Sequence, residues 1–475
     1  MIKTASTTIA LLGTTLAFGQ APTTKDVGQP PAYTPVRWNE NYTYLKTAPA
    51  KDLFDPIKHI SLGDDIYLSL GGQVRERYER WSNFNLGTGI QDANGFFLHR
   101  AFLHADLHVT DTFRLFAQIK SSLEDGRDGG PRAVDADEID IEQLFFDIKV
   151  PLPLGPKDAA TLRVGRQNLI YGAQRLISPL DWTNVRRTFE GVKLSTQISD
   201  HTLDAFWVRP VIVNKEQLND GDGDQSFAGI YDTIALPTVF DKAAATKLEL
   251  YFLALNQQAN AARPADADTY TIGARFSSAP KPWDIDAEVD YQFGSSGAGD
   301  IAAYSLALEG GYTFVNCEFT PRLYLGFDYA SGDDDLTDPD KQTFNQLFPL
   351  GHAYFGYADV IGRQNIIDIH PGVQFTLLKD KDYAKLVKLR ADYHLFMRAS
   401  TDDALYGVTG AVQRADTGSD SSDVGSEIDV LLDWQYDRHL SFYAGYSHFF
   451  AGDFFEETGS HDDIDFVYIA ASYTF

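Results

Sequence analysis

Arginine and lysine side chains recur at alternate positions along the sequence. In "GGQVRERYE" (71–79) Arg75 and Arg77 flank Glu76, and in "LVKLRADYHLFMR" (386–398) Lys388 and Arg390 flank Leu389. Alternate residues of an extended chain share one face, and a guanidinium binds a carboxylate through two parallel hydrogen bonds. A row of such groups is suited to a molecule that carries many carboxylates. The basic residues that we predict to share this face and to contact a substrate are Arg75, Arg77, Arg100, Arg114, Lys120, Arg163, Arg166, Arg175, Arg187, Arg322, Lys388, Arg390 and Arg398.

Carboxylates occupy the same face and offer a second interpretation. Glu79, Asp106, Asp286, Glu288 and Asp392 alternate in phase with the basic residues. In this alternative the arginines pair with these acids and stiffen the wall instead of binding a ligand.

The stretch "LRVGRQNLIYGAQRLISPLDWTNVRRTFEGVKL" (162–194) concentrates arginine and aromatic residues in a connection rich in glycine and proline. Arg163 and Arg166 belong to the strand that precedes it, and Arg175 and Arg187 lie within it. So long a connection indicates a functional loop folded against or into the body of the protein.

Extended strands must position all of these residues, because apolar and polar residues alternate with a period of two along most of the chain. Hydrophobic content of 44%, 38 glycines and only two methionines also favour an all-β protein. We predict about eighteen strands. They lie near residues 66–81, 97–109, 113–124, 138–149, 161–168, 187–198, 201–213, 246–256, 269–278, 284–294, 302–314, 319–330, 364–377, 386–398, 426–437, 440–451 and 464–475, with a further segment near 353–361.

Two architectures fit such strands, a soluble sandwich or propeller and a transmembrane β-barrel. The strands exceed the length of about five or six residues that is usual in soluble sheets. Aromatic residues such as Tyr78 and Trp434 lie near strand ends, as in the aromatic girdles of membrane barrels. The polar faces carry many charges, which a water-filled lumen accepts and a packed core does not. We therefore predict a transmembrane antiparallel barrel.

Both ends of the chain support this prediction. Residues 1–19 combine Lys3, an apolar stretch and the small residues Ala17 and Gly19, which is typical of a secretory signal peptide. No run of about 18 apolar residues follows that would form a transmembrane helix. The final strand resembles the signal that delivers barrels to the assembly machinery of the outer membrane, with hydrophobic residues at alternate positions: Val467, Ile469, Ala471, Tyr473 and Phe475.

Three stretches resemble the alginate export family. The 162–194 stretch contains Gly165, Arg166, Gln167, Tyr171, Gly172, Gln174, Arg175, Leu176, Pro179, Trp182, Asn184, Arg187, Phe189 and Gly191 at the spacing of that family's pattern. "TFNQLFPLGHAYFGYAD" (343–359) and "GGQVRERYE" are similar to it as well. The resemblance implies a monomeric eighteen-stranded barrel in the outer membrane of a Gram-negative cell, with an arginine-lined pore that exports a uronate polysaccharide.

The net charge of −27 excludes nucleic acid as a partner, because phosphate binding needs clustered basic residues. Acidic residues crowd loops such as "NDGDGDQ" (219–225) and "SGDDDLTDPD" (331–340). We expect no cofactor; the alternative is that these loops hold Ca²⁺ or Mg²⁺, or are bridged by such ions to lipopolysaccharide. The single Cys317 excludes a disulfide framework.

We expect three parts: a signal peptide (1–19), a periplasmic segment (20–60) that plugs the pore, meets a partner or is disordered, and an outer-membrane barrel (61–475). The function we predict is passive export of an anionic polysaccharide, in contact with membrane lipid and with a periplasmic scaffold protein as a further partner. The first alternative is a general porin for small sugars or anions. An outer-membrane enzyme is a remote alternative, since neither a Gly-x-Ser-x-Gly nor a His-Glu-x-x-His motif occurs.

Overall fold

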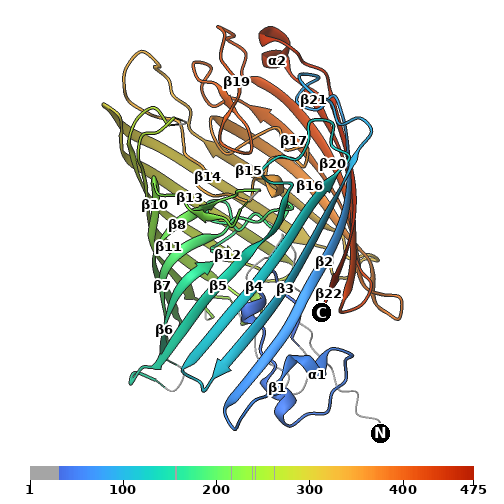
Figure 1. Cartoon of the computed structure of the whole chain (residues 1–475). Coiled ribbons are helices and arrows are strands. Elements are labelled where there is room, and N and C mark those ends of the chain that lie inside the picture. Colours follow the sequence, from blue (N-terminus) through green and yellow to red (C-terminus); the bar gives the residue numbers. More distant parts are fainter. Residues whose placement is uncertain (1–30, 156–157, 216, 238, 241, 262) are drawn as a thin grey trace.

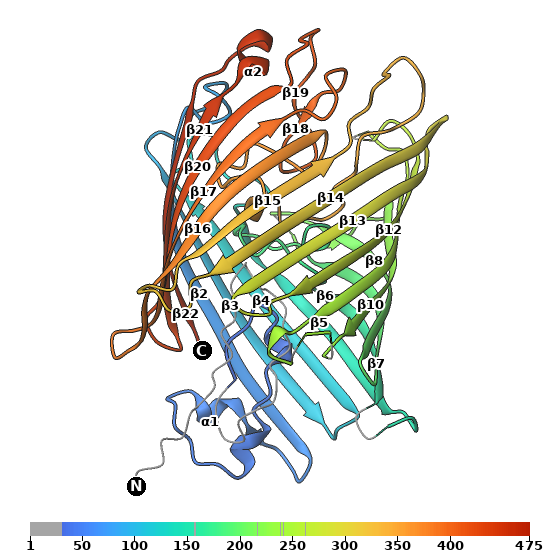
Figure 2. The same ribbon diagram turned by 180° about the vertical axis from the view of Figure 1, so that it is seen from behind.

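A closed antiparallel barrel forms the body of the protein (Figures 1 and 2). The computed structural model describes residues 31–155, 158–215, 217–237, 239–240, 242–261 and 263–475. The predicted signal peptide lies outside these residues. Twenty strands of the described chain form one sheet, of which eighteen build the barrel and two short ones, β1 and β9, extend it. This confirms the predicted fold class.

The barrel strands run in chain order around the wall. They are β2 (Ile66–Ser82), β3 (Phe96–Val109), β4 (Phe113–Asp125), β5 (Asp137–Pro151), β6 (Ala159–Gln167), β7 (Phe189–Ile198), β8 (His201–Ile212), β10 (Gln225–Ala235), β11 (Lys247–Gln257), β12 (Ala267–Ser278), β13 (Trp283–Ser296), β14 (Gly299–Thr313), β15 (Arg322–Ala330), β16 (Ile366–Lys381), β17 (Ala384–Met397), β20 (Asp423–Gln435), β21 (Leu440–Ala451) and β22 (Ile464–Thr474).

The other elements are short. The strands β1 (Ile60–Ser61) and β9 (Asp220–Gly221) pair with barrel strands, and β18 (Leu405–Tyr406) pairs with β19 (Val412–Arg414). The helices are η1 (Arg37–Asn39), η2 (Thr43–Lys46), α1 (Asp55–Lys58), η3 (Lys242–Ala244), η4 (Gly351–Ala353) and α2 (Asp453–Thr458). Within the described residues no helix is long and apolar enough to cross a membrane.

The last strand closes the barrel against the first. β22 pairs with β2 from Gln73↔Thr474 to Ser82↔Asp465. Phe475 continues the ladder, because its backbone N–H donates to the Gly72 carbonyl and its own carbonyl accepts from the Gly72 N–H. Closure removes the open sheet edges that a membrane cannot accommodate.

The strands alternate as predicted between an outer and an inner face. Val289 and Ile469 are 53% and 57% exposed on the outside, whereas Glu288 and Tyr468, which point inward, are buried. Val467 and Tyr473 also face outward, and Ala471 and Phe475 are half-buried. The role of these five C-terminal residues as an assembly signal remains a prediction.

Two of the strand assignments need correction. β10 was missed, because its inward residues Phe227, Gly229 and Tyr231 are apolar or small and lack the polar alternation of the other strands. The segment 353–361 is not a strand. It begins at the last residue of η4 and continues inside the barrel as a loop, where Glu427 on β20 accepts a hydrogen bond from the backbone N–H of Ala358 at 2.8 Å.

The two ends of the barrel differ. At one end, which we call the turn end, strands are joined by connections as short as residues 382–383 between β16 and β17. At the opposite loop end, residues 331–365 and 398–422 are long connections. The N-terminal segment, from residue 31 to α1, lies at the turn end (Figure 1). In outer-membrane barrels short turns face the periplasm, so the periplasmic location of this segment remains a prediction.

Candidate functional site

Two loops from the loop end fold into the barrel and pair with each other. The first luminal loop (168–188) joins β6 to β7, and the second luminal loop (331–365) joins β15 to β16. Ile177 and Phe348 form a parallel bridge. The Ser178 N–H donates to the Phe348 carbonyl at 2.8 Å, and the Phe348 N–H donates to the Leu176 carbonyl at 2.9 Å. The candidate transport pathway is therefore built from loops as well as from the wall.

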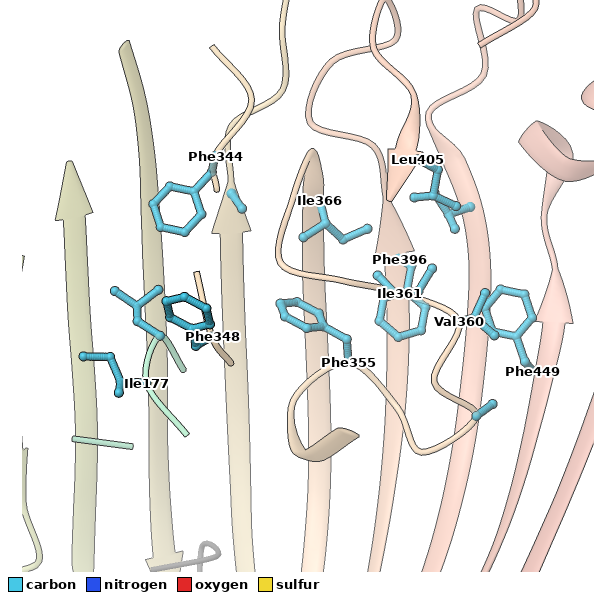
Figure 3. Packing of buried hydrophobic residues seen from close by; sticks show 14 of the residues in the cluster. Ile177, Phe344, Phe348, Phe355, Val360, Ile361, Ile366, Phe396, Leu405 and Phe449 are labelled. Atoms are coloured by element: carbon cyan, nitrogen blue, oxygen red, sulfur yellow. The ribbon is translucent and has the colours of Figure 1, made fainter. Parts of the chain in front are cut away.

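An apolar cluster lies between these loops and the barrel wall (Figure 3). Phe348 packs edge-to-face on Phe189 and Phe227, with ring centroids 5.1 and 4.9 Å away. Phe355, Val360 and Ile361 of the second loop are buried in the same cluster as Phe396 and Phe449 of the wall. The expectation of a polar, water-filled interior is wrong at this level, because the strands beneath the loops carry inward aromatic residues.

Three predicted arginines hold the first luminal loop. Arg75 and Arg100 donate to the backbone carbonyls of Asp181 and Thr183 at 2.9–3.0 Å. Arg77 donates to the Trp182 carbonyl at 2.5 Å, and its guanidinium lies over the Trp182 ring, 4.0 Å from the centroid. All three are buried on the inner face of β2 and β3. The structure thus places them inside the barrel, but against a loop.

Asn184 and two glycines fix the ends of this loop. The Asn184 amide donates to the carbonyls of His99, Leu123 and Asp135 at 2.8–3.1 Å, which ties the loop to β3, to β4 and to the residues just before β5. Gly165 and Gly191 pair in the β6–β7 register with φ of +134° and +155°. A Cβ at either would overlap a backbone carbonyl of the neighbouring strand. These motif residues therefore position the loop.

Arg175 and Arg187 lie within the first luminal loop. Arg175 reaches β13, where it contacts Asp286 and Glu288, each at 2.8 Å. Arg187 donates to the carbonyls of Ser178 and Pro349, at 3.2 and 3.3 Å, and so bridges both luminal loops. Burial lowers the pKa of Arg187 to about 10.

The remaining predicted arginines and Lys120 lie on the inner wall or at its loop end, and most pair with acids. This agrees with the interpretation that they pair with inward acids. The shortest contacts are Arg114–Asp106 (2.6 Å), Lys120–Asp137 (2.9 Å), Arg163–Asp147 (2.8 Å), Arg166–Glu190 (2.6 Å), Arg322–Asp284 (2.5 Å) and Arg390–Asp392 (2.6 Å). Lys388 is buried on β17, and Arg398 binds carbonyls of Ser419 and Ser421 in the next loop.

The N-terminal segment enters the barrel at the turn end. Arg37 donates to the carbonyls of Gly72 and Phe475 at 3.0 and 2.9 Å. Trp38 lies under the Arg163 guanidinium, 3.8 Å from ring centroid to Cζ, and Arg186 of the first luminal loop donates to the Pro35 carbonyl at 3.2 Å. The segment therefore lines the mouth along β2 to β6, and we call residues 31–58 the plug.

A cavity of about 550 Å³ remains between this plug and the wall. Its lining carries four cations and two carboxylates: Arg37, Arg186, Lys385, Arg438, Asp181 and Asp437. Arg37 and Arg438 also pair with Glu40 and Asp52 of the plug, at 2.5 and 3.1 Å. The predicted substrate contacts did not include Arg186, Lys385 and Arg438, because alternation along a strand does not show which residues line a cavity between a loop, the plug and the wall.

A second feature missed from the sequence is a histidine cluster on the inner wall. Asp368 and His370 are alternate residues of β16, and His394 lies beside them on β17. The ligand atoms of the three lie within 4.8 Å of one another. The Asp-x-His spacing in "DIH" was the available signal.

In the acidic loops, by contrast, carboxylates accept hydrogen bonds from nearby backbone N–H groups of the same loop, as when Asp335 accepts from the Thr337 N–H at 2.9 Å.

Comparisons with known proteins agree with this architecture. The chain resembles a BenF-like porin from Pseudomonas fluorescens Pf-5, with a TM-score of 0.56 and 13% identity over 86% of this chain and 98% of that one. It also resembles Pseudomonas aeruginosa OccK2 (OpdF) in complex with glucuronate, with a TM-score of 0.51 and 14% identity over 86% and 96% of the two chains. No curated protein sequence matches it. The model of the alginate export family matches residues 66–468, which cover both luminal loops, and the chain therefore belongs to the alginate export family of outer-membrane channels.

Proposed function

We propose that this channel passes an anionic, uronate-type polysaccharide across the outer membrane, from the turn end to the loop end. The carrying observation is the cavity behind the plug, where cations outnumber carboxylates four to two in a chain with a net charge of −27. Such a site concentrates anions at the mouth through which an exported chain enters. Guanidinium groups already paired with Glu40 and Asp52 can exchange these carboxylates for those of a uronate.

The position of the plug also supports a role for a periplasmic partner. Residues 31–58 occupy the β2–β6 side of the mouth, so a polymer that enters from the turn end meets them first. We propose that a periplasmic scaffold protein, or the polymer itself, displaces the plug. Membrane lipid and lipopolysaccharide are the expected surroundings of the outer face.

The closed arrangement of the two luminal loops favours a second candidate, a porin for small anions. A cavity of about 550 Å³ accommodates a small solute without displacement of any loop, whereas a polymer requires the paired loops to part. The OccK2 structure in complex with glucuronate shows that one porin of similar fold binds a single uronate.

Planar-bilayer recordings separate these candidates. The reversal potential across a KCl gradient is measured first, and then glucuronate, an oligo-uronate and a neutral oligosaccharide of equal length are added in turn. Polymer export predicts anion preference and block by the oligo-uronate at far lower concentration than by glucuronate. Equal block by monomer and oligomer supports the small-anion porin, and equal block by the neutral sugar contradicts both.

Lys385→Gln tests the cavity directly, with Lys381→Gln as the matched control. Both lysines are exposed at the turn end, but only Lys385 lines the cavity. We expect Lys385→Gln to reduce anion preference and oligo-uronate block, and Lys381→Gln to leave both unchanged. Equal effects of the two substitutions would show that the charge of the whole rim, and not this cavity, sets selectivity.

A further inference from the structure

We propose that Asp368, His370 and His394 form a binding site for a divalent transition-metal ion on the inner wall of the barrel. The site lies beneath the second luminal loop, and carboxylates of β20 complete its surroundings. This inference goes beyond the proposed transport function, which requires no metal.

The structure brings one potential ligand atom from each of the three side chains close together. The Nδ1 atoms of His370 and His394 each lie 2.8 Å from the same oxygen, Oδ2 of Asp368. The two imidazole rings stack with centroids 4.9 Å apart and an interplanar angle of 29°. Two imidazoles and one carboxylate on adjacent strands are a common ligand set for first-row transition metals.

The wall is shaped to hold these rings. Gly326 on β15 is in register with His370, and a Cβ at that position would overlap the His370 ring. The missing side chain lets the imidazole lie flat on β15 and turn its Nδ1 toward Asp368. Asp368 is fully buried and both histidines nearly so, which fixes their orientation.

Three buried carboxylate oxygens of β16 and β20 accept no hydrogen bond. Within the described chain, Oδ1 of Asp368, Oδ2 of Asp429 and Oε2 of Glu427 are buried and have no hydrogen-bond partner. The nearby arginines do not neutralise them, because Arg363 is paired with Asp328 at 2.7 Å and Arg390 with Asp392 at 2.6 Å. Buried carboxyl oxygens without hydrogen-bond partners are unfavourable, and a dication coordinated nearby offsets this cost.

His394 also has a carboxylate near its second ring nitrogen. Its Nε2 faces Oδ2 of Asp429 at 3.8 Å, on the opposite side of the ring from Asp368. Metal-binding histidines usually direct their other nitrogen toward a carboxylate, which fixes the tautomer. Imidazole ligands favour Zn²⁺, Co²⁺, Ni²⁺ or Cu²⁺ over Ca²⁺ and Mg²⁺, which prefer oxygen alone.

The site is linked to the second luminal loop. Asp429 and Glu427 accept hydrogen bonds from the backbone N–H groups of Tyr357 and Ala358, at 3.4 and 2.8 Å. A metal ion that orders these carboxylates therefore also orders the second luminal loop. Metal binding is expected to stabilise the closed arrangement of the two loops.

The test uses the tag-free, chelator-washed barrel in detergent. Titration with Zn²⁺ by calorimetry, and with Co²⁺ by visible absorption, is expected to show one site per chain. His394→Gln and His370→Gln should each weaken binding by at least about tenfold. His448→Gln is the matched control, because His448 lies at a half-buried outer position, where it pairs with Asp465 at 2.8 Å. This substitution should leave metal binding unchanged.

Two results would overturn the proposal. One is the absence of stoichiometric binding by the wild-type barrel between pH 6 and 8, which means that only protons occupy the cluster. The other is equal binding by wild type and the double variant His370→Gln/His394→Gln. If a variant fails to fold, X-ray absorption at the zinc edge of the wild-type protein decides: imidazole ligands support the site, and a shell of oxygen alone excludes it.

Discussion

The rings of Trp182 and His352 stack face to face, with centroids 3.6 Å apart and an interplanar angle of 10°. Trp182 belongs to the first luminal loop and His352 to the second, so this pair joins the two family motifs inside the barrel. The wall contributes to the same point, because the Arg77 guanidinium of β2 covers the Trp182 ring. Within the second luminal loop, Asp359 contacts His352 Nδ1 at 2.9 Å. The two motifs therefore build one closed unit across the lumen.

Trp182→Ala should loosen that unit. The substitution removes both the stack on His352 and the cation–π contact with Arg77, each worth about 1 kcal/mol in such surroundings. We expect larger and more variable single-channel conductance and a lower midpoint of urea unfolding. Trp283→Ala is the control, since Trp283 is 61% exposed on the outer face; an equal rise in conductance there would contradict the role of the stack.

Much of the fold could be predicted from the sequence, because every strand of a membrane barrel must turn apolar side chains toward the lipid. Strands such as β13, with Val289 outward and Glu288 inward, follow that rule closely. β10 was not predicted, because its inner residues Phe227 and Tyr231 pack against the luminal loops instead of facing water and are therefore not polar. Alternation of apolar and polar residues therefore identifies a barrel strand only where one face contacts lipid and the other contacts water.

The site was harder to predict, because its contacts join residues far apart in the chain. Alternation places Arg75 on the inner face, but its partners are carbonyls of the first luminal loop. The plug contacts of Arg37 with Gly72 and Phe475 are equally invisible in the sequence. Sequence reasoning thus gives the face of a residue, and the structure gives its partner.

Arg75→Gln should affect the loop more than selectivity. Arg75 satisfies two loop carbonyls, and leaving buried polar groups unpaired costs about 1–3 kcal/mol. We expect faster gating and lower stability, with little change in reversal potential. Arg80→Gln, on the outer face of the same strand, is the control. A large shift in reversal potential with unchanged gating would instead identify Arg75 as a substrate contact.

Trp38→Ala should release the plug. Trp38 stacks on Arg163 and packs edge-to-face on Phe145 at 6.1 Å, so its removal weakens docking at the β5–β6 side of the mouth. We expect higher conductance and faster tryptic cleavage at Lys46 and Lys51, which are exposed beside the mouth. Unchanged conductance together with faster cleavage would show that the plug does not limit the current.

Docking of the plug should also depend on pH through Lys58. Burial, followed by the charge of Arg37, lowers the pKa of Lys58 to about 7 in the docked plug, where its Nζ donates to the Leu70 carbonyl at 2.8 Å. In a released plug the pKa returns to about 10.4. Between these values the released state holds a proton that the docked state lacks, so docking strengthens as pH rises, by up to about tenfold per unit.

The expected readout is a conductance that falls from pH 7 to pH 9 and changes little below pH 7, where Lys58 is protonated in both states. Burial raises the pKa of the neighbouring Tyr33 and Tyr42 above their usual range, so neither titrates in this window. Lys58→Met has no titrating group at this position and should abolish the trend. A conductance that rises from pH 7 to pH 9 in the wild-type protein would show that Lys58 is not the controlling group, because its depressed pKa permits only the opposite sign.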